Sequence, residues 1–322
     1  MSTELLARLG VERPVVQAGM GGGIAGHELA AAVSAAGGLG TIGIFDPPVL
    51  RRELEAARAL TDKPIAVNIL LPFARREHWE VAAAADAVVT FWGRISRPPG
   101  VKCWIHQCGS VEEARAAHAA GADAVIAQGV EAGGHVRGTT PALELLERVR
   151  AAVPVPVLVA GGIATAADVA RATERGAEAA VLGTRFVMSD ESAAHPAYKE
   201  RLRGAQETVL TELFGLGWAE APHRVVPNAA TDRWLRDGAD MPRALRAVDR
   251  ALSPMLARIP LARQTMLART ASARVPLLSP APALADGPAR LVEATPLYAG
   301  ESVARIGDVR PASALVDELT PR

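Results

Sequence analysis

The chain has 322 residues, of which 49% are hydrophobic, so it is long enough for one domain of barrel size with a well-buried core. Aromatic residues make up only 4% of the sequence, so small and branched aliphatic side chains must fill that core. The 35 basic and 35 acidic residues balance, which provides neither a basic field for nucleic acid nor a polybasic patch for a membrane surface. This composition favours a small-molecule partner.

Short apolar, β-branched runs recur along the first 185 residues, and most are followed by an alanine-rich helical pattern. Because the runs are almost continuously apolar, they are typical of parallel strands that are covered on both faces. We expect strands at residues 15–17, 39–44, 65–70, 87–91, 101–105, 124–127, 157–160 and 179–182. We expect helices near residues 26–36, 49–60, 74–84, 111–120, 141–152 and 166–175.

These units predict an α/β fold, a closed (β/α)8 or TIM barrel formed by residues 1–189. Only the segment after the fourth strand, residues 93–100, is too short and too rich in proline for a full helix. An open doubly wound sheet is the alternative, but the strand order shows no clear reversal point, and this favours closure.

The pattern changes after Met188. Residues 190–275 are rich in arginine, include Trp218 and Trp234, and predict a mostly helical insertion after strand eight that forms a lid. Residues 276–322 predict a linker rich in proline and alanine, followed by a tail that returns to the barrel and ends in a helix from about residue 311.

The N-terminus lacks the cationic and apolar regions of a signal peptide, and no run approaches the roughly 18 apolar residues of a membrane span. We therefore expect a cytoplasmic protein without a membrane partner, in which Cys103 and Cys108 are reduced thiols. Cys-x4-Cys without a second ligand pair does not predict a metal site. A homodimer is left open.

Several polar or glycine-rich positions follow predicted strands, where a barrel carries its chemistry. The first is the turn Ala18-Gly-Met-Gly-Gly-Gly23, whose glycines permit either ligand contact or only a tight turn. It lacks the spacing and the acidic partner of a dinucleotide-binding fingerprint. Asn68 and Gln128 carry amides in apolar runs, and each requires hydrogen bonds from either the fold or a ligand.

The turns after strands seven and eight form a further candidate site. Gly161, Gly162, Gly183 and Thr184 offer backbone N–H groups with little steric obstruction. Because these two loops often bind phosphate in barrels, we predict a phosphate site here, against the alternative of two ordinary turns.

The most informative segment is Gln128-Gly-Val-Glu-Ala-Gly-Gly-His135. Gly133 and Gly134 leave room for a flat group against the backbone. A solvated loop histidine is the alternative interpretation of His135, but its position beside a predicted phosphate site favours a catalytic role near neutral pH. The other histidines, among them His106 and His223, have no comparable sequence context.

Together these residues resemble the nitronate monooxygenase (2-nitropropane dioxygenase-like) family of FMN-dependent barrels. The resemblance covers residues 10–190 and extends weakly to residues 298–302. It rests on six segments: Val16–Met20, Asn68, Thr90–Gly93, Gln128–His135, Ala160–Ile163 and Gly183–Phe186.

The resemblance implies FMN, with Asn68, Gln128 and Gly133 near the flavin and its ribityl chain. It also implies that the backbone of Ala18, Gly19 and Met20 lies against the isoalloxazine, and that Gly162, Gly183 and Thr184 hold the phosphate. His135 would be the catalytic residue near flavin N5. The substrates would be an alkyl nitronate, or another small electron donor, and O2.

The chain departs from the family pattern at three places: Gly19 stands where a proline is usual, the stretch between Asn68 and Gln128 is short, and Val136 is an additional residue before Arg137. Gly19 concerns the backbone under the flavin, the short stretch concerns the walls of the substrate pocket, and Val136 concerns the loop that would close over the substrate. Related alternatives on the same barrel are an enoyl-acyl-carrier-protein reductase or a quinone reductase that uses NAD(P)H. A flavin-binding protein without turnover is the non-enzymatic alternative.

Overall fold

The computed structural model describes residues 4–215, 218, 220–235, 241–256, 258–275 and 279–321. Eight parallel strands form one sheet in the spatial order β1-β9-β8-β6-β5-β4-β3-β2. The bridge between Val16 and Leu39, flanked by backbone hydrogen bonds, joins β1 to β2 and closes the sheet. The strands are β1 (Val15–Gln17), β2 (Gly40–Ile42), β3 (Ile65–Leu70), β4 (Ala87–Phe91), β5 (Trp104–Cys108), β6 (Ala124–Gln128), β8 (Val157–Ala160) and β9 (Ala180–Leu182). The predicted (β/α)8 barrel is confirmed.

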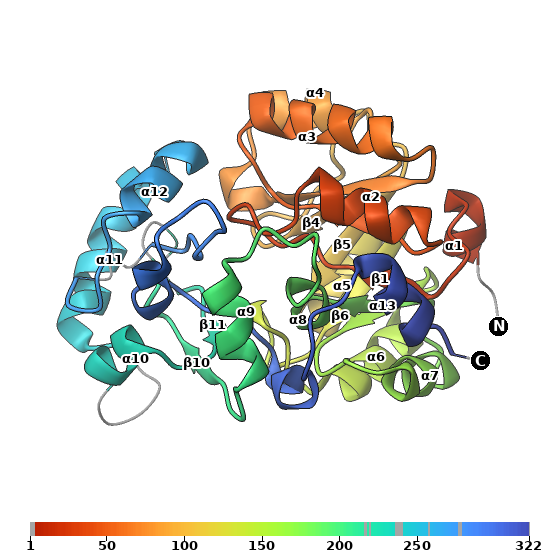
Figure 1. Cartoon of the computed structure of the whole chain (residues 1–322). Helices are drawn as coiled ribbons and strands as arrows, with labels where there is room; N and C mark the ends of the chain where they lie inside the picture. Colours follow the sequence, from red (N-terminus) through yellow and green to blue (C-terminus); the bar gives the residue numbers. More distant parts are fainter. Residues whose placement is uncertain are drawn as a thin grey trace.

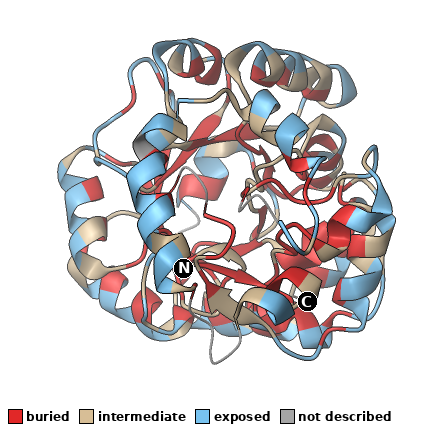
Figure 2. Cartoon of the chain, turned by 90° about the vertical axis from the view of Figure 1, so that its left-hand side faces the viewer, coloured by how far each residue is buried: buried red, intermediate tan, exposed pale blue. Residues whose placement is uncertain are grey.

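Helices surround the strands and turn their exposed residues outward, as Figure 2 shows. Each predicted helix forms within two residues of its expected bounds. They are α2 (His27–Ala35), α3 (Pro47–Leu60), α4 (Arg76–Ala82), α5 (Val111–Ala119), α6 (Ala142–Ala152) and α7 (Ala166–Glu174). No helix forms in residues 92–103, which are all described, and this agrees with the proline-rich sequence there.

The core has two layers. Inside the barrel, side chains such as Val89, Ile105 and Leu158 pack together, while the opposite faces of the strands pack on the helices. The N-terminal helix α1 (Glu4–Leu9), which the sequence pattern does not predict, adds Leu5 and Leu6 to the inner layer. Its first N–H groups donate to a carboxylate oxygen of Glu178, so the helix start has side-chain acceptors.

The expected fifth strand, 101–105, is wrong by three residues at each end, since β5 covers Trp104–Cys108. The predicted strand ends at Ile105 because the polar residues His106 and Gln107 follow it. In the structure, His106 bonds to the Thr90 hydroxyl at 2.8 Å and Gln107 faces the central cavity, so the strand continues through them.

The segment after β9 is mostly helical, with α8 (Thr184–Val187), α9 (Pro196–Arg203), α10 (Ala229–Trp234), α11 (Arg243–Leu256) and α12 (Leu261–Ala268). Figure 1 shows α11 and α12 at one end of the barrel. The segment also forms an unpredicted hairpin of β10 (Val209–Thr211) and β11 (His223–Val225). β11 pairs antiparallel with the short strand β7 (Gly134–His135). His135 therefore does not end a barrel strand but lies in this small sheet, seven residues beyond Gln128.

The tail contains η2 (Ala289–Glu293), η3 (Glu301–Arg305) and α13 (Ala312–Leu319). α13 packs against both α2 and α7, with Leu315, Val316 and Leu319 fully buried. It therefore occupies the outer position that would follow strand eight, where α8 has only four residues. The division at residues 189 and 275 stays a prediction.

In the described residues, no helix is long and apolar enough to span a membrane. A cytoplasmic location stays a prediction.

Candidate active site

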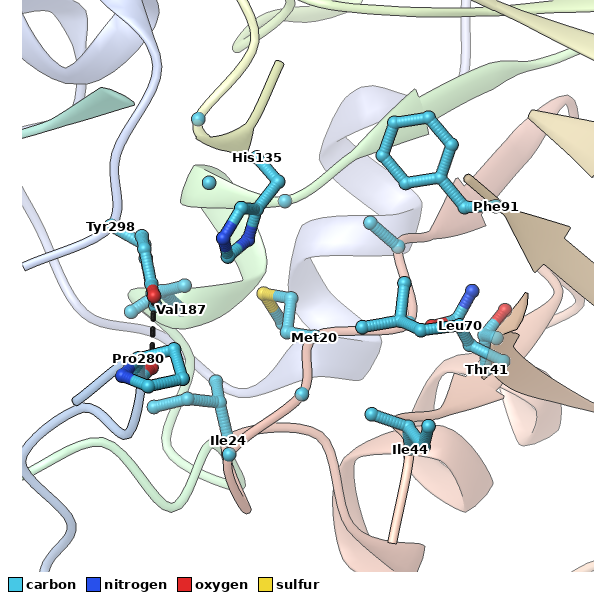
Figure 3. Close-up of a pocket in the computed structure, with 18 of the residues that line it drawn as sticks. Met20, Ile24, Thr41, Ile44, Leu70, Phe91, His135, Val187, Pro280 and Tyr298 are labelled. Atoms are coloured by element: carbon cyan, nitrogen blue, oxygen red, sulfur yellow. Dashed lines mark hydrogen bonds between the residues drawn. The ribbon is translucent and has the colours of Figure 1, made fainter. Parts of the chain in front are cut away.

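A cavity of about 590 Å³ opens at the C-terminal ends of the barrel strands. Its volume lies within the roughly 300–1,000 Å³ range of sites for small molecules and cofactors. Every residue that the sequence assigned to the site lines it: Ala18, Gly19, Met20, Asn68, Gln128, Gly133, Gly134, His135, Gly161, Gly162, Gly183 and Thr184. Figure 3 shows the side chains of Met20 and His135 projecting into the same space, with Tyr298 beside them.

One wall is formed by the turn after β1. A Cβ atom at Gly19 would lie 2.3 Å from Cβ of Asn68, so only glycine fits against this neighbour. A proline at position 19 is excluded for the same reason. The Asn68 amide donates to the Val89 carbonyl at 3.3 Å, and the nearby Thr41 hydroxyl is buried without a partner in the described part of the chain. Thr41 also lines the cavity, a role that the sequence does not indicate because Thr41 lies inside the predicted strand 39–44 and not at its end.

The turns after β8 and β9 present unused donors. The backbone N–H groups of Gly162, Ile163, Gly183 and Thr184 make no hydrogen bond to any other described residue. Gly162 has a φ of 69°, a conformation that glycine adopts without strain. Four N–H groups along one wall form the kind of surface that binds an anion such as phosphate.

An ion pair holds this wall from behind. Asp168 accepts the N–H groups of Ala164 and Thr165, and its carboxylate lies 2.6 Å from the Arg305 guanidinium. Arg305 also donates to the Gly162 carbonyl. Burial alone would raise the pKa of Asp168, but the Ala164 N–H and the bonds to Arg305 and Thr165 outweigh it and lower that pKa. The tail thus fixes the loop after β8.

The tail also forms part of the site itself. The Gly300 N–H donates to the Thr184 hydroxyl at 2.9 Å, and the Glu301 N–H donates to the Glu131 carbonyl at 3.0 Å. A Cβ atom at Gly133 would lie 2.5 Å from the Gly300 nitrogen. The backbone of Ala299 and Gly300, which is distant in sequence, therefore passes so close to Gly133 that a side chain does not fit there. The resemblance at residues 298–302 marks this part of the tail, but it does not indicate the contact with Gly133.

Gln128 braces the loop that carries His135. Its amide donates to the His135 carbonyl at 2.8 Å, and its oxygen accepts the Arg137 N–H at 3.1 Å. The additional residue Val136 is buried and donates its N–H to the Pro222 carbonyl, so it extends the pairing with β11. The family departure at Val136 is thus accommodated in the small sheet.

The imidazole of His135 is surrounded by aromatic rings. It stacks on Trp218 with ring centroids 4.0 Å apart, and His223 and Tyr298 lie at 5.1 and 5.8 Å. Its Nε2 atom is buried without a partner in the described residues. Burial, assisted by His223, holds the pKa of His135 well below its usual range, so the ring is neutral at pH 7.

His223 is fixed in one neutral form, a role that sequence reasoning missed. Its Nδ1 lies 3.2 Å from the Ala221 carbonyl, and its Nε2 accepts the Phe214 N–H at 3.2 Å. Because one ring nitrogen must donate and the other must accept, protonation would break the second bond. Burial lowers the pKa of His223 to about 4. His223 and Trp218 lie far from the barrel motifs in sequence and reach the site only through the hairpin.

Among the described residues, no group of three or more His, Cys, Asp or Glu side chains is arranged to hold a metal ion. Cys103 and Cys108 are buried free thiols.

Known proteins are similar to this chain along most of its length. A family model described as nitronate monooxygenase matches residues 2–103 and 99–322. A nitronate monooxygenase of Pseudomonas aeruginosa is 32% identical over 71% of this chain and 82% of its own length. A 5-hydroxy-7a-methyl-1-oxo-octahydro-indene-4-carboxyl-CoA dehydrogenase of Rhodococcus jostii is 36% identical over 70% of this chain, a match that spans only 66% of that dehydrogenase.

Two solved structures are similar to this chain over nearly its whole length. FabK from Thermotoga maritima superposes with a TM-score of 0.77 at 32% identity, covering 99% of this chain and 95% of FabK. A nitroalkane oxidase from Streptomyces ansochromogenes gives 0.75 at 28% identity, covering 98% of this chain and 96% of that protein.

Proposed function

The chain belongs to the nitronate monooxygenase family of flavin-dependent oxidoreductases, and on that premise we propose that it uses FMN and O2 to oxidise alkyl nitronates to a carbonyl compound and nitrite. The observation that carries the proposal is the unpartnered, buried Nε2 of a neutral His135 in a cavity of cofactor size.

The cavity fits FMN in three respects. Ala18, Gly19 and Met20 offer a wall without bulky branches for the isoalloxazine. Asn68, Gln128, Gly133 and Gly134 line the same cavity and would contact the flavin edge and the ribityl chain. The free N–H groups beside Gly161, Gly162, Gly183 and Thr184 would hold the phosphate.

Bound there, FMN would supply the electron transfer that no side chain of the protein can provide. The residues of the chain would hold the cofactor and the substrate in place and would bind the proton that leaves the substrate. His135 Nε2 would take the α-proton of a neutral nitroalkane, or would hydrogen-bond to an oxygen of a nitronate that arrives already ionised. The fold keeps this imidazole neutral, and its tautomer selects the role: Nε2 without a proton would take the α-proton, whereas Nε2–H would donate to a nitronate oxygen.

A flavin reductase that takes its electrons from NAD(P)H is the second candidate. The observation behind it is that a protein named a dehydrogenase and FabK, neither named a nitronate monooxygenase, are similar to this chain at more than 30% identity. A flavin-binding protein without turnover is not carried forward, because the chain belongs to a family of oxidoreductases.

Anaerobic mixing separates the two candidates. We expect the yellow holoprotein to keep its flavin absorbance with NADH and NADPH and to bleach when ethyl nitronate is added. Fast bleaching by a nicotinamide, with none by the nitronate, would reject the proposal in favour of a reductase. The homodimer and the role of residues 190–275 as a lid stay predictions.

A further inference from the structure

Two stacked aromatic rings each leave a polar atom unused on the cavity. Trp218 is 7% exposed, and its Nε1 is buried without a partner in the described residues. The Nε2 of His135 is in the same state, and both residues line the cavity. A buried N–H without an acceptor is unfavourable, so each such group requires an explanation, and at a cavity a polar ligand atom supplies one.

The surroundings of Trp218 fix its plane. Its ring makes edge contacts with Phe73 at 5.3 Å and with Trp92 at 5.0 Å, while its face stacks on His135. Trp92 adopts a φ of 67°, which is strained for a bulky residue. In this conformation the Trp92 ring packs against the indole of Trp218. An indole held on one face and two sides has little freedom to turn its N–H elsewhere.

The chemistry of the two atoms is complementary. An indole N–H can only donate a hydrogen bond, whereas the Nε2 of a neutral imidazole can accept a proton. A substrate that gives a proton to His135 must place the electron pair of the broken C–H bond elsewhere. In a nitroalkane that pair forms the C=N bond, and the negative charge moves to the two oxygens.

We propose that Trp218 donates a hydrogen bond from Nε1 to a substrate oxygen beside His135 and thereby selects planar oxyanions such as nitronates. Trp218 is then a second catalytic residue, since its N–H meets the negative charge that develops as the proton moves to His135. This role deepens the proposed function, but the binding of an oxyanion does not depend on which electron donor the enzyme uses.

The test is titration of the holoprotein with nitrate, a planar oxyanion that cannot reduce a flavin, followed by flavin absorbance. Trp218→Phe keeps an aromatic ring that can stack on His135 and removes the N–H together with the five-membered ring that carries it. We expect its Kd for nitrate to rise by about 10-fold or more, the scale of one hydrogen bond to a charged group. The matched control is Trp79→Phe, the same change at a tryptophan of α4 that does not line the cavity and packs on the outer core, and it should change Kd by less than about twofold.

A measurement on the wild-type protein covers the case in which Trp218→Phe does not fold. With 15N-labelled tryptophan, the chain gives five indole N–H signals, and nitrate should move one signal downfield that persists in Trp79→Phe. Nitrate that does not bind, five unmoved signals, or an equal loss of affinity in both variants would each overturn the assignment. Failure of the proposed function would look different: no bleaching by nitronate, with nitrate binding still dependent on Trp218.

Discussion

Replacing Gly133 with alanine tests whether the tail is part of the cofactor site. The new Cβ would lie 2.5 Å from the Gly300 nitrogen and 2.6 Å from the Ala299 carbonyl carbon. Both neighbours are backbone atoms, so the tail must move by most of an ångström to reach an ordinary contact distance. That movement strains the Gly300 bond to the Thr184 hydroxyl and the Glu301 bond to the Glu131 carbonyl.

The expected cost follows from these contacts. Overpacking costs roughly 1–3 kcal/mol, and each weakened hydrogen bond adds up to about 1 kcal/mol. We expect a loss of about 2–4 kcal/mol, which lowers Tm by roughly 3–6 °C for an unfolding entropy of about 2.1 cal/mol/K per residue over 322 residues. Because Thr184 lies at the predicted phosphate wall, the affinity for FMN should fall as well.

Thermal unfolding with and without FMN measures both effects. Gly307→Ala is the matched control, since this glycine lies in the same tail, has no atom within 4 Å of an added Cβ and does not adopt a left-handed φ. It should unfold within about 0.5 kcal/mol of the wild type. An unchanged Tm and FMN affinity in Gly133→Ala would refute the close crossing of the tail over this loop.

Three further predictions concern the site and its supports. His135→Ala should keep its yellow flavin but lose turnover by roughly 10²-fold or more, the scale of general acid–base catalysis, and full activity would remove His135 from the mechanism. Arg305→Ala should weaken FMN binding several-fold because the Gly162 loop loses its ion-paired support. Arg171 pairs with the same Asp168 at 3.5 Å but does not reach the loop, so Arg171→Ala should leave FMN binding unchanged. Equal FMN affinities of the two variants in a fluorescence titration would contradict this prediction. Burial lowers the pKa of His106 and His223 to about 4, so the unfolded chain takes up protons below its ordinary histidine pKa while the folded chain does not. The free energy of unfolding should therefore fall as the pH drops from about 6.5 to 4, by about 3 kcal/mol per histidine, and a flat urea-unfolding profile across this window would contradict it.

The barrel could be predicted from the sequence because its signals are local. Apolar runs fix each strand, and the helices that follow have their own periodicity. Residues that directly follow strands, such as Asn68, Gly161 and Gly183, could be placed because the ends of parallel strands meet at one edge. Their grouping around one cavity required no knowledge of distant contacts.

The remainder depends on contacts between distant segments. Trp218 and His223 reach His135 through a hairpin whose strands have three residues each, too short for an alternating pattern to reveal. Gln107 lies outside the predicted strand because a polar residue indicates a strand end, but in the structure it belongs to β5 and lines the cavity. In the same way, nothing near Gly133 in sequence indicates that Gly300 crosses it.

The position of α13 has a consequence for folding during synthesis. All eight strands have been made once residue 182 is complete, yet the surface between α2 and α7 is covered only by residues 312–319. A nascent chain must therefore expose this apolar strip while more than a hundred further residues are added. Such an intermediate is prone to aggregation. A chaperone that binds apolar surface should therefore bind released chains truncated between residues 190 and 310 more tightly than the chain that includes α13.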